Sequence, residues 1–233
     1  MTTLRSRSSL RLLCLFLVAI VAGFVAGCGS DDDGGEGGAA GTTAAETTVN
    51  GECHEVEAPD PKSDGGEKPP TEALDPAKTY RLIVQTNCGT FTIELDQKTA
   101  PKTAASLVSL AESGFYDGTT FHRVVPGFII QGGDPTGTGG GGPGYKTVDV
   151  PPSDAAYTKG VVAMAKAQNE APGTSGSQFF VVTGPDIGLP AEYAVVGKVT
   201  DGMVTVEAID ALGTGDGPPS MPVVMERVTV QAS

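Results

Sequence analysis

Hydrophobic and polar residues alternate in two neighbouring segments, residues 80–86 (YRLIVQT) and 89–95 (GTFTIEL). Both are rich in β-branched residues, and in the second every other residue is apolar, which is typical of a strand with one covered face. The turn-prone residues Asn87 and Cys88 stand between them. The pattern therefore predicts a β-hairpin.

Helical spacing of apolar residues appears in two places. Residues 100–113 start with a proline near their N-terminus, place Leu107, Leu110 and Ala111 on one face, and end before a glycine. Residues 204–212 (VTVEAIDAL) show a second, shorter helical pattern. We therefore expect two helices within a chain that is otherwise rich in strands.

Further short apolar segments are separated by turn-forming residues, and each predicts a strand. These segments are residues 120–124, 128–131, 161–164, 178–182, 194–199 and 223–231. Many short strands with intervening turns favour a mainly β fold, either a closed antiparallel barrel or a sandwich, with the helices covering its open ends. Residues 79–233 are long enough for one such domain.

The first 27 residues have the layout of an export signal. Three arginines and no acidic residue precede an apolar segment, residues 12–27, which is shorter than the ~20 residues that span a bilayer. Residues 25–28 (VAGC) resemble the lipobox of bacterial lipoproteins, in which the cysteine, here Cys28, is lipidated and begins the mature chain. An ordinary secretory signal or a short anchor is the alternative. We expect an extracytoplasmic protein that is lipid-anchored to a bacterial membrane.

Residues 28–78 separate this signal from the domain. Glycine, threonine and acidic residues dominate residues 29–52, which cannot bury a core and predict a solvated linker. Residues 53–78 hold five prolines and predict an irregular arm. Without the three arginines of the signal, 12 basic residues stand against 28 acidic ones, a net charge of −16. This balance argues against binding of nucleic acid or electrostatic adhesion to anionic lipid.

Four cysteines are present. Cys14 would leave with the signal and Cys28 would carry the lipid, so Cys53 and Cys88 remain in an oxidising compartment, where a pair of cysteines suggests a disulfide. The alternative is a metal site around residues 53–57 (CHEVE), but this cluster lacks the second ligand pair of a structural zinc site. We expect no metal and no cofactor.

Two other short motifs resemble functional sites, but the sequence in or around each of them does not fit that function. Residues 137–142 (GTGGGG) fit the glycine pattern of dinucleotide-binding loops, but prolines follow where a helix should begin, so they predict a plain loop. Residues 173–177 (GTSGS) lack the final glycine of the nucleophile elbow of hydrolases. The domain holds a single histidine, His122, around which any serine-histidine relay would have to be built.

Three blocks resemble the cyclophilin family of peptidyl-prolyl cis-trans isomerases. They are residues 121–134 (FHRVVPGFIIQGGD), 160–182 (GVVAMAKAQNEAPGTSGSQFFVV) and 193–199 (YAVVGKV), and they lie in the order and spacing of that family. The resemblance covers residues 79–233. It implies a closed eight-stranded antiparallel β-barrel that is capped at each end by a helix.

The resemblance also gives Arg123 a chemical role. Rotation about an Xaa-Pro bond breaks amide resonance but no covalent bond, so neither a nucleophile nor a base is needed. As the amide twists, the prolyl nitrogen exposes a lone pair, and a fixed cationic donor beside it stabilises the transition state. Arginine is always protonated and suits this task. The family match places Arg123 there, with Gln131 bracing it and contacting the substrate backbone.

An apolar pocket for the proline ring is implied at Phe128, Ile129, Phe180 and Leu189, with Phe128 counted among the catalytic residues. The remaining substrate-binding residues that the resemblance implies are His122, Ala165, Lys166, Gln178 and Tyr193. Backbone groups near residues 165 and 166 would bind an extended peptide. On pattern alone Phe128, Ile129 and Phe180 also suit a plain core, and a packing or orienting role for His122 stays open.

Departures from the family lie at the rim of the site. Lys166 stands where asparagine is usual, Gly188 where many members have tryptophan, and Tyr193 where histidine is frequent. Two hypotheses follow: an active, monomeric isomerase that acts on proline-containing polypeptides during the folding of exported proteins, or a catalytically weakened peptide-binding module on the cell surface. The retained Arg123 and Gln131 favour the isomerase.

Overall fold

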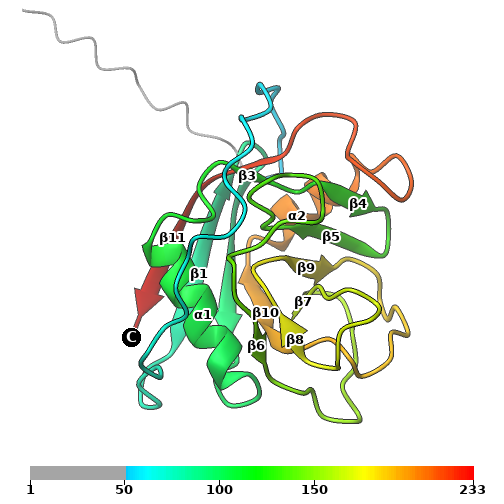
Figure 1. Cartoon of the computed structure of the whole chain (residues 1–233). Helices are drawn as coiled ribbons and strands as arrows, with labels where there is room; N and C mark the ends of the chain where they lie inside the picture. Colours follow the sequence, from blue (N-terminus) through cyan, green and yellow to red (C-terminus); the bar gives the residue numbers. More distant parts are fainter. Residues whose placement is uncertain (1–50) are drawn as a thin grey trace, which may run out of the picture. The chain divides into compact units, whose positions relative to one another are not determined.

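The computed structural model describes residues 51–233, which form two helices and eleven strands (Figure 1). The signal predicted for residues 1–27, the lipidation site at Cys28 and the linker up to residue 50 lie outside these described residues. Within residues 51–233, neither helix is long and apolar enough to cross a bilayer.

The elements of the domain follow one another as short strands interrupted by two helices. The strands are β1 (Tyr80–Thr86), β2 (Gly89–Leu95), β3 (Thr119–Thr120), β4 (Arg123–Val125), β5 (Ile129–Gly132), β6 (Thr147–Val148), β7 (Val161–Met164), β8 (Thr174–Ser175), β9 (Phe179–Val182), β10 (Val195–Asp201) and β11 (Val224–Ala232). The helices are α1 (Pro101–Glu112) and α2 (Met203–Asp210). The hairpin predicted from the alternation of residues 80–95 is confirmed, with Thr86 opposite Gly89 across the turn.

Nine strands form one curled antiparallel sheet in the order β3-β11-β1-β2-β10-β7-β9-β5-β4. Strands β3 and β4 are its two ends, so the sheet is a half-barrel that does not close. A separate sheet of two strands pairs β6 with β8. The mainly β fold with two helices is confirmed, whereas the prediction of a closed, eight-stranded barrel was wrong in both closure and strand number.

The sheet stays open because the single strand predicted over residues 120–124 is broken into β3 and β4. The N–H of Phe121 bonds to the carbonyl of Val223, beside β11, at 2.9 Å. The N–H of Val124 bonds instead to the carbonyl of Gly217, in the loop after α2, at 2.8 Å. The two ends of this segment therefore pair with different partners, and only an isolated bridge between Thr120 and Asp134 connects the region of β3 with that of β5.

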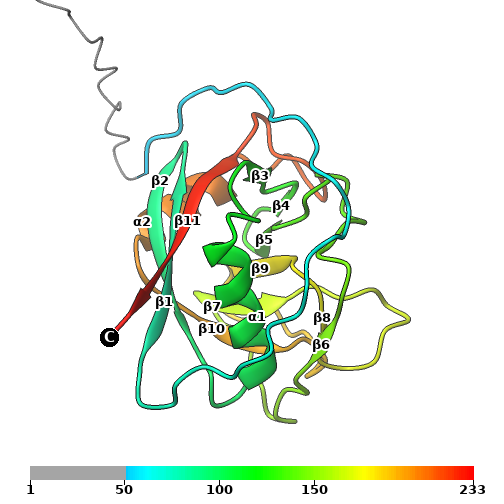
Figure 2. The ribbon, with the colours of Figure 1, turned by 60° about the vertical axis from the view of Figure 1, so that its left-hand side comes forward.

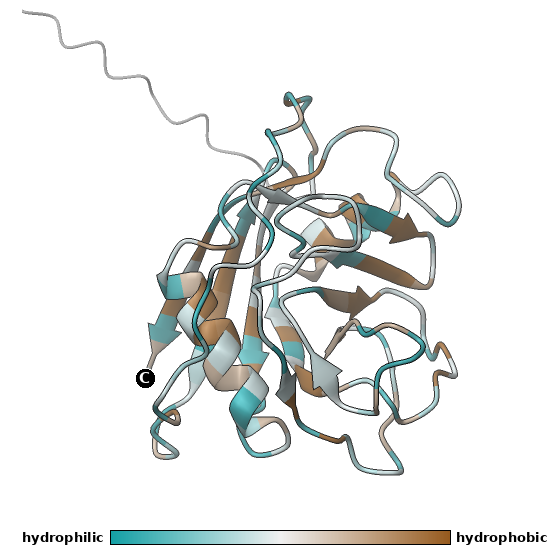
Figure 3. Ribbon diagram, in the orientation of Figure 1, coloured by the Kyte–Doolittle hydropathy of each residue, from teal (hydrophilic) through white to brown (hydrophobic). Residues whose placement is uncertain are grey.

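Each helix covers a different part of the curled sheet (Figure 2). Helix α1 contacts β1, β6 and β11, and its Leu107 and Leu110 are buried in the main core. Helix α2 contacts β2, β4 and β5, and it buries Val206 and Ile209. Hydropathy follows this arrangement, since the most hydrophobic residues gather on the strands and on both helices (Figure 3). The face of α1 that carries Leu107, Leu110 and Ala111 is thus covered, as its helical spacing predicts.

The arm, residues 51–78, contains no helix or strand but lies against the domain (Figure 2). A disulfide joins its Cys53 to Cys88 in the β1–β2 turn. Next to the disulfide, the N–H of His54 bonds to the carbonyl of Asn87 at 3.0 Å, and the side-chain amide of Asn87 returns a bond to the carbonyl of His54 at 2.8 Å. The start of the arm is therefore fixed to the first hairpin by covalent and polar contacts.

Replacing Cys53 with alanine should lower the free energy of unfolding. The disulfide closes a loop with a sequence separation of 35 residues, and constraint of an unfolded loop of this size contributes about 3–4 kcal/mol on the chain-entropy estimate. Denaturant unfolding of Cys53→Ala beside the unaltered chain measures the difference. The unaltered chain under reducing conditions should match the variant, and free thiols at both positions in the non-reduced chain, seen by mass spectrometry, would contradict the pairing.

Candidate functional site

Strand register brings three of the predicted residues side by side. Arg123 of β4 lies opposite Gln131 of β5, and Gln131 lies opposite Phe180 of β9. Directly paired residues in antiparallel strands project from the same face of a sheet. A cation, an amide and an aromatic ring therefore follow one another across three strands.

A tight turn places Phe128 beside this row. The N–H of Phe128 bonds to the carbonyl of Val125 at 3.0 Å, and Gly127 between them has a φ of +68°, which suits the third position of a Pro-Gly turn. The carboxylate of Asp210, on α2, accepts the Gly127 N–H and also the hydroxyl of Thr183 at 2.7 Å. Helix α2 therefore holds the turn that carries Phe128.

The guanidinium of Arg123 is held at two of its nitrogens. Nη1 donates to Oε1 of Gln131 at 3.1 Å, and Nε donates to Oδ1 of Asp216 at 2.6 Å. The arginine side chain is 32% exposed and that of Asp216 is 70% exposed. Arg123 holds the pKa of Asp216 below the ordinary value of 3.8, through the hydrogen bond and its charge. Sequence reasoning missed Asp216, because no local pattern distinguishes it from the other acidic residues of the chain.

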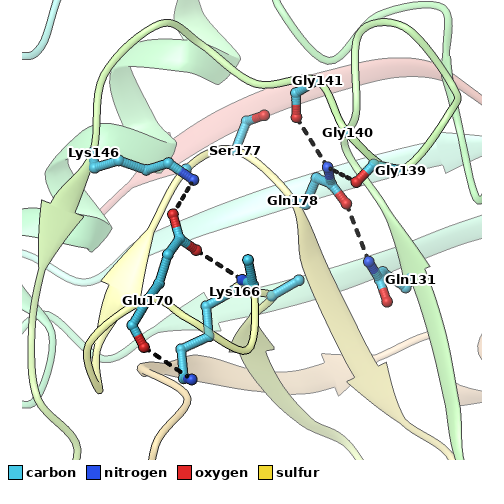
Figure 4. A pocket seen from close by; sticks show the side chains of 12 residues that line it. Gln131, Gly139, Gly140, Gly141, Lys146, Lys166, Glu170, Ser177 and Gln178 are labelled. Atoms are coloured by element: carbon cyan, nitrogen blue, oxygen red, sulfur yellow. Dashed lines mark hydrogen bonds and ion pairs between the residues drawn. The ribbon is translucent and has the colours of Figure 1, made fainter.

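Gln131 is also hydrogen-bonded to Gln178, the next residue of the site. Its Nε2 donates to Oε1 of Gln178 at 3.1 Å, and Nε2 of Gln178 donates to the carbonyls of Gly139 and Gly141 at 3.0 and 2.9 Å (Figure 4). Each amide has a donor and an acceptor in use, so its orientation is defined. Arg123 is thereby connected through two glutamines to the glycine-rich loop.

The apolar residues of the predicted pocket form a hydrophobic cluster of their own, apart from the main core. Its buried members include Ile129 and Phe180, and partly buried residues pack against them. Those partly buried residues include Phe128, Ala165, Leu189 and Tyr193. The structure thus brings together all six apolar or aromatic residues that the resemblance had placed in or beside the proline pocket.

Tyr157 belongs to the same cluster and was missed by sequence reasoning, since it lies in a loop without periodicity. Its hydroxyl donates to the carbonyl of Tyr193 at 2.8 Å and accepts from the N–H of Tyr193 at 3.0 Å. The rings of Tyr157 and Phe180 are both close to the ring of Tyr193, with centroids 6.0 and 5.7 Å away. Burial raises the pKa of Tyr157. Tyr157 therefore fixes the position of Tyr193 at the rim.

Lys166 is nearly enclosed, with a side chain only 2% exposed. Its Nζ lies 3.0 Å from Oε2 of Glu192 and 5.4 Å from the ring centroid of Tyr193, and it donates to the carbonyl of Glu170 at 3.3 Å. Two of the residues that depart from the family, Lys166 and Tyr193, thus contact one another. A buried ammonium needs such partners, which explains why the lysine is tolerated here.

A cavity of about 310 Å³ opens beside Gln131, Gln178 and Lys166 (Figure 4). Glu170 lines it, accepts the N–H of Ala167 at 2.7 Å and pairs with Lys146 at 3.0 Å. Burial alone would raise the pKa of Glu170, but these two partners outweigh it, so the pKa lies below its usual value. The cavity is polar and charged, in contrast to the adjoining apolar cluster.

Two expectations at the site need refinement. The N–H of Ala165 bonds to the carbonyl of Gln178 at 2.9 Å, so this backbone donor is already used within the fold. His122 does not join the apolar cluster, and neither of its ring nitrogens meets a hydrogen-bond partner among the described residues. It lies near Gly139 and lines a different cavity of about 260 Å³. Burial lowers the pKa of His122 from 6.5, and the nearby Asp134 opposes this only in part.

Within residues 51–233 no group of His, Cys, Asp and Glu side chains is arranged to hold a metal ion. Cys53, which the alternative metal site would have used, is engaged in the disulfide with Cys88. The site therefore consists of a fixed guanidinium beside an apolar cluster and a polar cavity. Such an arrangement can bind a small apolar ring and place a cationic donor next to it.

Comparison with known proteins agrees with this arrangement. Residues 81–230 match the family described as cyclophilin type peptidyl-prolyl cis-trans isomerase. Peptidyl-prolyl cis-trans isomerase A of Mycobacterium tuberculosis is 42% identical over 174 residues, which cover 66% of this chain and 94% of the relative. Peptidyl-prolyl cis-trans isomerase-like 1 of Gibberella zeae is 39% identical over 141 residues, covering 59% and 85%.

Two crystal structures of a Cryptosporidium parvum cyclophilin type isomerase are also similar. One superimposes with a TM-score of 0.60 at 32% identity and covers 66% of this chain and 98% of the other. The second, determined in the presence of the dipeptide Ala-Pro, has a TM-score of 0.59 at 33% identity and covers 65% and 98%. The chain therefore belongs to the cyclophilin-type peptidyl-prolyl cis-trans isomerase family and is an enzyme of that class.

Proposed function

We propose that this chain accelerates rotation about Xaa-Pro bonds of exported proteins, with Arg123 as the donor to the prolyl nitrogen. The observation that carries the proposal is the fixed guanidinium of Arg123, held by Gln131 and Asp216 beside the apolar cluster of Phe128, Ile129 and Phe180. The family supplies the reaction class. The geometry of these residues supports the proposed mechanism, in which Arg123 donates to the prolyl nitrogen.

The mechanism follows from the energetics of the amide bond. The uncatalysed barrier of ~18–20 kcal/mol arises from the resonance that is lost when the peptide bond twists. At the twisted state the lone pair of the prolyl nitrogen is localised, whereas in the planar ground state it is delocalised into the carbonyl, so a donor placed there binds the transition state selectively. Arginine has five N–H donors in a rigid fork. Contacts to Gln131 and Asp216 use two of them, and they hold the fork in one orientation.

The apolar cluster has the complementary task of holding the proline ring. Phe128, Leu189 and Tyr193 are only partly buried and pack on the buried Ile129 and Phe180, so they present an apolar surface at the edge of the site. A proline ring on this surface would bring its nitrogen toward the row of Gln131 and Arg123, which lies next to Phe180 in the sheet. Gln131 would then contact the substrate backbone as well as brace the arginine.

The extracytoplasmic location is part of the proposal. The signal layout of residues 1–27 and the lipobox-like sequence that ends at Cys28 support it. The disulfide between Cys53 and Cys88 gives independent support, because such bonds persist outside the reducing cytoplasm. On this proposal the substrates are proline-containing segments of proteins that fold after export.

Replacing Arg123 with alanine should lower kcat/KM for an Xaa-Pro peptide about tenfold or more, because at least ~1.4 kcal/mol of transition-state stabilisation is lost. A protease-coupled assay of peptide isomerisation measures this. Arg81→Ala is the matched control, since Arg81 is 31% exposed and paired with Glu94 at 2.8 Å on the distant β1–β2 hairpin. Full activity in Arg123→Ala would overturn the proposed mechanism. An unaltered chain that binds proline peptides without accelerating isomerisation would instead indicate the binding module.

Activity should stay nearly constant between about pH 6.5 and 8, because no proton is transferred in the reaction. It should also resist chelators, because bond rotation assisted by an arginine needs no metal ion. His122 has a pKa lowered from 6.5 by burial, so it takes up its proton only below this range. Asp216 has a pKa below 3.8, so its pair with Arg123 is present above that pH and is lost as the pH falls further. A pH profile of kcat/KM with a steep change near neutrality would contradict this and implicate His122.

Replacing Cys28 with alanine should release the chain from membranes, since the lipid would have no attachment site. Fractionation of a bacterial host that expresses the unaltered chain or Cys28→Ala measures the distribution. We expect the unaltered chain in the membrane fraction and the variant, without lipid, in the soluble fraction. Cys53→Ala, which leaves the lipobox intact, is the control. Equal lipid labelling of the unaltered chain and Cys28→Ala would contradict lipidation at this residue.

A further inference from the structure

The loop that borders the polar cavity has little stiffness of its own. Five of the six residues from 137 to 142 are glycines, and glycine loses more conformational freedom on ordering than any other residue. Gly137 and Gly139 adopt φ values of +69° and +88°, which favour glycine at these points. Contacts with its surroundings must therefore determine where the loop lies.

Asp134 provides the first set of contacts, at the base of the loop. Its carboxylate is fully buried and accepts the N–H groups of Thr136, Gly139 and Gly141 at 2.8, 2.5 and 3.2 Å. Burial raises the pKa of Asp134, but these hydrogen bonds outweigh it and hold the pKa below its usual value. The start and middle of the loop are thus organised from within the domain.

The inner side of the loop is hydrogen-bonded to residues of the substrate site. The carbonyls of Gly139 and Gly141 both accept from Gln178, whose other end accepts from Gln131 (Figure 4). If these carbonyls moved, Gln178 would lose both acceptors, and the amide that accepts from Gln131 would no longer be held in place. The position of the loop therefore affects the residues that line the peptide site.

The outer end of the loop is held by the arm. Oδ1 of Asp64 accepts the N–H of Gly142 at 2.9 Å, and the N–H of Gly65 donates to the carbonyl of Gly142 at 2.9 Å. One step further, the N–H of Glu67 donates to the carbonyl of Pro143 at 3.0 Å. The two backbones approach so closely that a Cβ at Gly144 would lie 3.0 Å from the nitrogen of Gly66.

Lys62 fixes this part of the arm to the domain. Its Nζ donates to the carbonyls of Gly114, Phe115 and Asp117 at 3.3, 2.7 and 2.8 Å, in the segment that follows α1. Its own N–H donates to the carbonyl of Pro135 at 2.8 Å. The arm is therefore attached at Lys62 and at the disulfide of Cys53. All of these arm residues precede residues 81–230, the part that matches the family.

We propose that the arm is a brace for the substrate site, in which Lys62 and Asp64 act as positioning residues. The brace holds the glycine-rich loop so that Gly139 and Gly141 keep Gln178, and through it Gln131, in the orientation that receives the peptide. This inference rests on the proposed function, since the readout that matters is turnover of an Xaa-Pro substrate. It assigns to an added N-terminal segment a role in the binding of substrate by the family domain.

The first test replaces Asp64 in the full-length chain. Asp64→Ala should raise KM for an Xaa-Pro peptide about three- to tenfold with little change in kcat, which is the effect of one lost hydrogen bond. Asp64→Asn keeps an oxygen acceptor for the Gly142 N–H and should restore most of the affinity. Lys68→Ala removes an exposed charge of the arm that has no partner among the described residues, and it should leave KM unchanged.

A double-mutant cycle decides whether the arm acts through Gln178. If it does, Asp64→Ala should raise KM in the unaltered chain but hardly at all when added to Gln178→Ala, because the connection is already broken. A general loss of stability would give the same factor in both backgrounds. Equal effects of Asp64→Ala in the two backgrounds, or no effect in either, would overturn the proposal.

Hydrogen exchange separates this proposal from the proposed function. In Asp64→Ala and in Lys62→Ala the amides of residues 139–142 should exchange faster than in Lys68→Ala, whether or not the chain turns over peptide. Unchanged exchange would show that the arm does not hold the loop and would overturn the brace even if the enzyme is active. If the unaltered chain were inactive but the variants showed the expected faster exchange, the proposed function would be refuted. The conclusion that the arm holds the loop would still stand.

Discussion

A shift of one residue between β4 and β5 would turn Arg123 away from Gln131, because side chains alternate between the two faces of a sheet. The antiparallel register of β4, β5 and β9 is therefore the constraint on which the site depends. It is fixed by buried residues that interleave with the polar ones, notably Val124 and Ile130, which are fully buried. The main core thus determines the face on which the arginine appears, although the arginine itself lies outside that core.

Charge pairing gives the cations of the site fixed positions in an acidic protein. Arg123 faces Asp216, Lys166 faces Glu192, and Lys146 faces Glu170, at distances between 2.6 and 3.0 Å. An exposed pair such as Arg123–Asp216 contributes little to stability, so its importance lies in orientation. The pair of the enclosed Lys166 differs, because it also compensates a buried ammonium. For a reaction that needs one correctly aimed donor and no proton transfer, a partly exposed but well-oriented guanidinium is sufficient.

Local patterns and the family resemblance predicted much of the domain. Alternation gave the first hairpin, helical spacing gave both helices, and the resemblance placed Phe128, Ile129 and Phe180 in what proves to be a separate apolar cluster. Closure of the sheet was mispredicted, because the break after Thr120 depends on carbonyls of Gly217 and Val223, in the distant segment between α2 and β11. Asp216 was missed for a similar reason, since it reaches Arg123 across a separation of 93 residues.

The arm shows why composition alone describes such a segment incompletely. The five prolines of the arm correctly predicted that it is irregular. Backbone N–H and C=O groups that lack partners in regular structure must, however, find partners elsewhere. The glycine-rich loop has the same need, because its own residues form no ladder. Where residues 64–67 meet residues 142–143, each irregular segment supplies donors and acceptors for the other. The absence of regular structure in both segments is thus what leaves their backbone groups free to pair.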